Sequence, residues 1–547
     1  MRKVLLYICS VFILGGMTSC EDFLDKREDV GLTEDDIFRD YYSLRGFLDQ
    51  SFNQLENVMV MDNWENGRAF VGLFADEMAT TDNSSAVFTL HSGNWLSNAK
   101  SNKTFEIGNA GSTAISRSYK ALRINNRIIN DIDKAPLTPE QKNEILGQAY
   151  FYRSWFYFQI IKRYGGMPII DKVFEGGDDD IPRMTYHESH DWMMEDIQKA
   201  IYMLPDSWDD PNYGRPTKIA AMALKEWAQL FDASPLMQND LNSTENKGYD
   251  TERAKSAAKS AYEVIRYMDG SKSAPYPYGL ASKEEYTNVF YFKYPPVHQP
   301  EYIWVKRQFP NAANQNQKRT IRTFWQYEDL AFGSGPDGNS MCCPSLNIVN
   351  MFDKKGADGI YYPIDDPRSG YALDYDHKPF EDRDPRFYNN ILLPGTTWGH
   401  YADGRTYYIT TYKGGAAYQH MLTQKDCNKR MFTGFMCKKF MWPECNQYLE
   451  KNNPNCWWDY RFLTIYIRAS QIYLDYAEAL FEGCGSATAT IEGCPISAAE
   501  AINILRRRIG LTDLPSDIVA DPDKFRAAYR RERAVELMFE NHRLWDI

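Results

Sequence analysis

The chain has 547 residues and a formal net charge of −12, with 62 Lys and Arg against 74 Asp and Glu. An acidic balance of this size disfavours nucleic acid and anionic lipid as partners. After the N-terminal leader, no segment offers the roughly 18 uninterrupted apolar residues of a membrane-spanning helix. No long low-complexity linker divides the chain, so we expect one large unit with insertions.

The N-terminus has the pattern of a lipoprotein leader. Two cations precede an apolar run from Val4 to Met17, which is typical of a secretory signal peptide and too short to span a bilayer. Thr18-Ser19-Cys20 then matches a bacterial lipobox. We therefore expect cleavage after residue 19 and a diacylglycerol on the sulfur of Cys20, which would anchor the protein. A plain signal peptide with a chance cysteine is the alternative.

Much of the chain has helical periodicity. Thr138-Pro139-Glu140-Gln141 predicts a helix start with Thr138 as N-cap, and Gly165-Gly166 predicts its end. Paired helices joined by short turns indicate a helical-repeat scaffold, although no strict sequence period is visible. We predict helices at 115–132, 138–164, 187–203, 216–233, 250–268, 464–482, 496–509 and 522–540.

The middle of the chain, from about Pro275 to Trp458, has a different composition. It is rich in Gly, Pro, Asn, Tyr and Trp, and it contains short β-like runs at Tyr302–Val305 and Tyr407–Thr411. We predict a long, loop-rich insertion on the helical scaffold, and loops carry function more often than scaffolds do.

Eight cysteines lie after residue 340, and an exported chain can oxidise them. The sequence contains no C-x2-C pair of the kind that binds zinc. Disulfides and buried thiols both remain open, and Cys484–Cys494 is the pair that we expect to close a local loop. The eight are Cys342, Cys343, Cys427, Cys437, Cys445, Cys456, Cys484 and Cys494.

Several motifs follow one another in a specific order. They are Gly147 to Phe158 with Lys162 to Ile170, Gly214 to Leu224 with Ala233-Ser234-Pro235, Arg383 to Phe387, Ile467 to Ala479, and Arg531 to Arg543. Together they resemble the SusD/RagB family, and the resemblance extends from Cys20 to Ile547. Family members usually continue past Trp545-Asp546-Ile547, so we expect the last helix to lack its normal cover. Ile115 and Ser116 stand where the family usually has a tryptophan.

The resemblance implies a mainly α fold: a SusD-like helical scaffold of degenerate tetratricopeptide-like helix pairs, with a large loop-rich insertion containing short β strands. It implies four parts: a signal peptide (1–19), an N-terminal helical region (20–274), an irregular subdomain (275–460) and C-terminal helices that complete the scaffold (461–547). Most of the motifs then mark scaffold, and the aromatic run Tyr150–Phe158 is expected in the core.

The resemblance also implies a function. The family are surface lipoproteins of the outer membrane that bind nutrients, mostly glycans, without catalysis, and deliver them to a TonB-dependent, SusC-like transporter. Glu21-Asp22 resemble the acidic signal that directs lipoproteins of the Bacteroides group to the cell surface. No cofactor is implied. Two alternatives stay open: peptide capture by the same architecture, and a structural lid on the transporter with no ligand site.

A glycan site needs flat aromatic faces and planar polar groups that bond vicinal hydroxyls. Three loop regions offer them, although any one tryptophan there could instead pack locally or contact the transporter. The candidate ligand-binding residues are Trp64, Arg68, Asn94, Trp95 and Asn98 in the first region, Trp325 and Tyr327 in the second, and Trp398 in the third.

Other chemistries lack their motifs. Asp76-Glu77 are sequence neighbours, whereas glycoside hydrolysis needs two carboxylates that flank the bond at about 5–9 Å. His187-Glu188-Ser189-His190 lacks the spacing of an H-E-x-x-H zinc helix. The acidic segment from Asp353 to Gly359 fits a calcium loop poorly and is interpreted as acidic turns. We therefore expect no metal and no enzyme activity.

Overall fold

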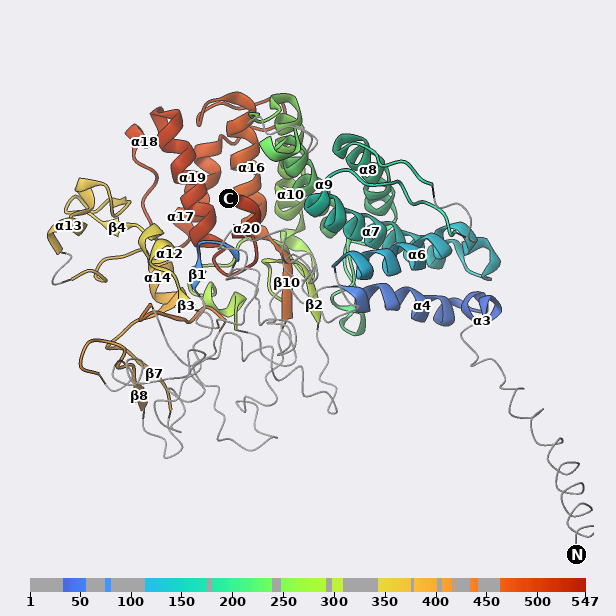
Figure 1. The fold of residues 1–547 in the computed structure, drawn as a ribbon, viewed down its shortest axis with the longest axis horizontal. Helices are drawn as coiled ribbons and strands as arrows, with labels where there is room; N and C mark the ends of the chain where they lie inside the picture. The colour runs from blue at the N-terminus through green and yellow to red at the C-terminus, as the bar shows by residue number, and fades with distance from the viewer. Residues whose placement is uncertain are drawn as a thin grey trace, which may run out of the picture.

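The computed structural model describes residues 33–55, 74–79, 114–174, 180–238, 247–291, 298–307, 343–374, 378–400, 406–415, 418, 433–440 and 463–547. Over these residues the protein is mainly helical, and its longer helices lie side by side in a row (Figure 1). This arrangement confirms the predicted mainly α scaffold. Among the described helices, none combines the length and the apolar composition needed to cross a membrane.

The first part of the row runs through consecutive helices, each packed against the next. The helix that begins at Pro139 is capped as the sequence predicts: the Gln141 amide donates to the Thr138 hydroxyl at 3.3 Å, and the Gln141 side chain accepts from the Thr138 amide at 3.0 Å. The helices are α3 (Glu34–Phe38), α4 (Tyr41–Gln54), α6 (Ala114–Asp131), α7 (Pro139–Tyr164), α8 (Tyr186–Met203), α9 (Lys218–Ala233) and α10 (Thr251–Gly270).

The C-terminal helices complete the row. α16 packs directly against α10, although about 200 residues separate the two in the sequence, and α17 and α19 pack on α16 (Figure 1). The elements are α16 (Ala469–Cys484), α17 (Ala498–Arg508), α18 (Ser516–Ala520), α19 (Pro522–Glu536) and α20 (Arg543–Asp546). The loop-rich part is thus inserted between two halves of one helical layer.

Between α10 and α16, the described residues form short elements, as predicted for the insertion. The strands make two-stranded antiparallel pairs: β1 (Met78–Ala79) with β3 (Cys343–Pro344), β2 (Tyr302–Arg307) with β10 (Leu463–Arg468), β4 (Lys354–Lys355) with β5 (Tyr361–Tyr362), β6 (Ile391–Leu392) with β9 (Met436–Cys437), and β7 (Thr397–His400) with β8 (Thr406–Tyr408). The short helices are α12 (Leu346–Met351), α13 (Tyr371–Asp374) and α14 (Pro385–Asn390).

Six of the eight predicted helices match within two residues at each end, and two predictions are partly wrong. The segment predicted as helix from 464 begins as strand β10, which pairs with β2 and whose six residues are all buried. The helix predicted to reach 540 ends at Glu536, because Phe539 and Asn541 adopt positive φ angles of 65° and 67°. Of the β-like run at 407–411, only the first two residues belong to a strand, β8.

The central helix α7 carries the core of the row. Phe151, Trp155 and Phe158 are buried, and Trp155 packs edge-on against Trp304 of β2 with ring centroids 4.7 Å apart. This packing confirms that the aromatic run Tyr150–Phe158 is core.

Buried ion pairs tie the C-terminal helices to the elements packed against them. Arg386 of α14 contacts Glu532 and Glu536 of α19 at 2.5 and 3.0 Å. Arg468, at the end of β10, contacts Glu536 at 2.9 Å and Glu540 at 2.7 Å. Each of these side chains is at most 3% exposed, so the loss of one charge would unbalance a buried network of ion pairs.

The expected Cys484–Cys494 disulfide is wrong, because both residues are thiols in the structure. Local turns shape the two ends of the loop: the Cys494 amide donates to the Ile491 carbonyl at 2.9 Å, and Gly485 ends α16 in the left-handed conformation. Cys494 is 3% exposed and packs in the core of the helical row.

Candidate functional site

Most of the predicted site residues lie outside the described part of the chain. Trp398 lies on β7, and its side chain is outside the described part of the chain. The other candidates also lie outside the described residues: the lipidation site Cys20 and the ligand-binding candidates Trp64, Arg68, Asn94, Trp95, Asn98, Trp325 and Tyr327. Their roles therefore stay predictions.

Asp76 and Glu77 have separate structural roles. The carboxylate of Asp76 accepts two bonds from Arg543 at 2.6 and 2.7 Å, and this interaction lowers the Asp76 pKa. Glu77 is 1% exposed and accepts from the Phe539 amide at 2.9 Å. Burial raises the pKa of Glu77 to about 8. Both side chains thus hold the C-terminal segment that follows α19.

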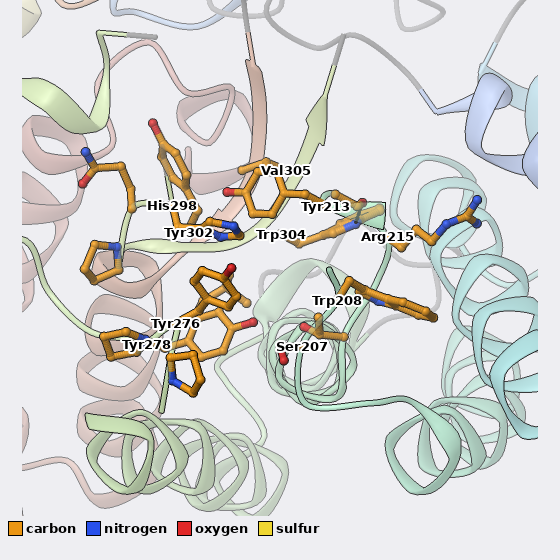
Figure 2. Close-up of a pocket in the computed structure, with 17 residues that line it drawn as sticks. Ser207, Trp208, Tyr213, Arg215, Tyr276, Tyr278, His298, Tyr302, Trp304 and Val305 are labelled. Atoms are coloured by element: carbon orange, nitrogen blue, oxygen red, sulfur yellow. Dashed lines mark hydrogen bonds between the residues drawn. The ribbon is translucent and has the colours of Figure 1, made fainter. Parts of the chain in front are cut away.

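A cavity lined by aromatic side chains lies beside the row of helices. It has a volume of about 130 Å³, and three segments form it: the α8–α9 connection at 207–217, the loop after α10 at 275–278, and the residues 298–305 that lead into β2 (Figure 2). Prolines at 205, 211, 216, 275, 277 and 300 keep these segments from continuing as helix or inner strand. We call this cavity the aromatic pocket.

Hydrogen bonds to backbone carbonyls fix two tryptophans of the aromatic pocket. The Trp208 indole donates to the Pro216 carbonyl at 2.8 Å, and the Trp304 indole donates to the Gly214 carbonyl at 3.2 Å. In Figure 2, Trp208 and Ser207 lie across the pocket from Trp304 and Tyr213. The two indoles therefore flank the cavity in fixed orientations, so little side-chain entropy is lost when a ligand binds.

A stack of rings forms the rim of the aromatic pocket. Tyr276 stacks on His298 with centroids 3.8 Å apart and planes 25° apart, and Tyr213 meets the same imidazole edge-on at 4.3 Å. The His298 Nε2 lies 3.2 Å from Asp210, which orients the imidazole. Tyr276 is 37% exposed, so its ring is available to a ligand.

Polar groups complete the lining. Ser207 and Gln299 present a hydroxyl and an amide. Arg215 is held in place by the Asp49 carboxylate at 2.6 and 2.9 Å and by the side-chain amide oxygen of Gln148 at 3.0 Å. The described lining contains rings, hydroxyls, an amide and a guanidinium, and it contains no carboxylate. It can stack on and hydrogen-bond a flat polyhydroxylated ligand, and it does not supply the paired carboxylates of a glycosidase.

The two histidines of 187–190 belong to an ion cluster between α8, α9 and α10. Candidate ligand atoms of His190, Asp191 and Asp232 lie within 4.8 Å of one another, and His187 Nδ1 is 2.6 Å from Asp232. The guanidinium of Arg253 already contacts Asp232. Because a permanent cation occupies this position, the cluster is a structural tie between helices.

The aromatic pocket was missed because its residues do not stand out in the sequence. Trp208 lies among acids in Asp206-Ser-Trp-Asp-Asp210, and Pro275-Tyr276-Pro277-Tyr278 resembles an ordinary loop. The available signal was the alternation of proline and tyrosine, which fixes the backbone and presents aromatic rings.

Two family models match the chain. The model described as the SusD family matches residues 300–547, and the model described as starch-binding, associating with outer membrane, matches residues 22–226. The comparison with curated proteins found no match.

Solved structures with the same fold cover nearly the whole chain. A SusD-like protein from Bacteroides fragilis is 23% identical with a TM-score of 0.66, and the match covers 94% of this chain and 87% of that one. A SusD-like carbohydrate-binding protein from the same species is 20% identical, with a TM-score of 0.65 and coverage of 93% and 86%. A laminarin-binding SusD-like protein is 18% identical, with a TM-score of 0.58 and coverage of 93% and 90%.

Proposed function

The chain belongs to the SusD/RagB family, and from this premise we propose that it is a surface protein of the outer membrane that binds an oligosaccharide and performs no catalysis. The ligand is passed to a TonB-dependent, SusC-like transporter, and the lipid on Cys20 tethers the protein beside it. Relatives described as carbohydrate-binding and laminarin-binding support the choice of a glycan.

The aromatic pocket is the observation that carries this proposal. Trp208, Tyr276 and Tyr278, which are not buried, offer flat apolar faces to the C–H side of sugar rings, and the amide and hydroxyls of the pocket can bond sugar hydroxyls. The Trp208 indole, which is fixed by a backbone carbonyl, is suited to such stacking, because it loses little freedom on binding. Trp64, Trp95 and Trp325 remain proposed platforms of a loop-borne site.

A calorimetric panel tests the proposal. The soluble protein that begins at Glu21 is titrated with glycans of several classes and with peptides, and each mixture is then examined for cleavage products. We expect one glycan class to bind and to remain intact. Tight binding of peptides alone would favour peptide capture, and a folded protein that binds nothing would favour a structural lid.

Single variants then locate the site. Tyr276→Ala tests the aromatic pocket, whereas Trp64→Ala, Trp95→Ala and Trp325→Ala test the loop regions. A loss of affinity confined to Tyr276→Ala assigns binding to the aromatic pocket. A loss confined to one loop tryptophan would assign it to the corresponding loop.

A further inference from the structure

We infer that the aromatic pocket is the inner chamber of a two-chamber groove divided by Trp208, and that this groove selects an extended oligosaccharide without acidic groups. The inference rests on the proposed function, because it specifies the ligand of the same site. It follows from a second cavity, from the position of Trp208 and from the charges around it.

The second cavity adjoins the aromatic pocket. It has a volume of about 420 Å³ and lies between the start of α4, the start of α7 and the α8–α9 connection. Ser207 and Trp208 line both cavities, so the two chambers meet at these residues. The inner chamber alone is smaller than usual small-molecule sites of roughly 300–1,000 Å³, whereas both chambers together fall within that range.

Trp208 is built as a fixed partition. Its indole bond to the Pro216 carbonyl anchors one edge of the ring, and the helical turn Asp210–Asn212 follows it directly. In the proposed groove, a sugar chain that occupies both chambers lies along this ring. Affinity should rise with chain length until both chambers are filled, because each further sugar adds stacking area and hydrogen bonds.

The outer chamber is acidic. Glu140, Glu144 and Asp209 line it, and Arg45 is the one cation among its described lining residues. Arg45 is directed onto Asn212, with which its guanidinium forms a hydrogen bond. Hydrogen bonds at the start of α7 lower the pKa of Glu140, so this carboxylate stays charged at neutral pH.

This charge pattern discriminates between glycans. A neutral sugar can donate its hydroxyl protons to the carboxylates, which are pure acceptors. A uronate or a sulfate would face like charges at short range, which is costly and is only partly relieved by screening. Exclusion of anions is thus a property of the outer chamber, whereas stacking is a property of both.

The test uses one ligand in two charge states. The neutral glycan that binds best in the panel is prepared as a series from disaccharide to hexasaccharide, and the hexasaccharide is also oxidised at C6 to its uronate form. Binding is measured by calorimetry for the wild-type protein, for Trp208→Ala, for Glu140→Gln/Asp209→Asn, and for Tyr202→Ala. Tyr202 is the matched control, because it is an 87% exposed aromatic residue near the end of α8 and lines neither chamber.

We expect the hexasaccharide to bind at least tenfold more tightly than the disaccharide and the uronate form at least tenfold more weakly than the neutral one. Trp208→Ala should remove most of the chain-length gain, and Tyr202→Ala should not change it. Glu140→Gln/Asp209→Asn should restore binding of the uronate form. Equal affinity for both charge states, or for both chain lengths, would overturn the inference while leaving the proposed function intact. If no glycan binds at all, the proposed function fails and this inference fails with it.

Discussion

Glu77 should make the protein less stable as the pH rises, and Glu77→Gln should remove that effect. The carboxyl is buried and lies against the turn that follows α19, where it accepts a bond from the Phe539 amide. Burial raises its pKa from 4.5 to about 8. When the pKa of a carboxyl is higher in the folded state, the stability that the group contributes is fully present below the unfolded pKa. For Glu77 this stability is lost as the pH rises from 4.5 to about 8.

The magnitude follows from the two pKa values. At 1.36 kcal/mol for each pKa unit, the raised pKa of Glu77 costs about 5 kcal/mol of stability at pH 8.5 and less than about 1 kcal/mol at pH 5. For a chain of this size, about 5 kcal/mol corresponds to about 4 °C in Tm if unfolding is cooperative. The amide of Glu77→Gln is neutral at every pH and keeps an acceptor for the Phe539 amide.

Thermal unfolding of the wild-type protein and of Glu77→Gln at pH 5 and pH 8.5 measures the effect. We expect similar Tm values at pH 5 and a Tm higher by a few degrees for the variant at pH 8.5. Asp76→Asn is the control of opposite sign. Arg543 lowers the pKa of Asp76, so the charged Asp76 carboxylate stabilises the fold above its ordinary pKa of 3.8. The variant should therefore be less stable than the wild type at both pH values. Parallel pH profiles for wild type and Glu77→Gln would refute the reasoning.

Three further outcomes concern the scaffold. Arg386→Met should lower the free energy of unfolding by about 3–5 kcal/mol in urea titrations, because it removes the guanidinium that pairs buried Asp384 and one of the cations beside Glu532 and Glu536, and an unchanged midpoint would contradict that account. Gly166→Ala should destabilise by about 1–3 kcal/mol, since its Cβ would lie 2.0 Å from a backbone oxygen, whereas Gly270→Ala meets open space and should be neutral or stabilising in the same titration. Alkylation of the unreduced, denatured protein followed by mass spectrometry should label Cys484 and Cys494, and a peptide pair joined through them would show that the loop is bridged.

Local sequence signals were sufficient to predict most of the scaffold. The capping box of Thr138 predicted the start of α7 to within one residue, and Gly165 predicted its last residue, Tyr164, correctly. Such signals act over a few residues, and so they can be recognised without knowledge of the fold.

Long-range contacts caused the errors. β10 was mistaken for helix because all six of its residues are buried, which removes the alternation that usually identifies a strand. α19 stops early because the following turn is held by Glu77, 462 positions away in the sequence. The aromatic pocket likewise needs three distant segments, and no local pattern marks Trp208 or Tyr276 as neighbours.

The central claim is that the aromatic pocket binds an oligosaccharide, and one calorimetric comparison tests it most directly. The panel glycan with the highest affinity is titrated into the wild-type protein and into Tyr276→Ala, which removes an exposed rim ring without touching the core. The account predicts that Kd rises at least tenfold in the variant, which corresponds to about 1.4 kcal/mol. An unchanged Kd in a folded Tyr276→Ala variant would contradict it.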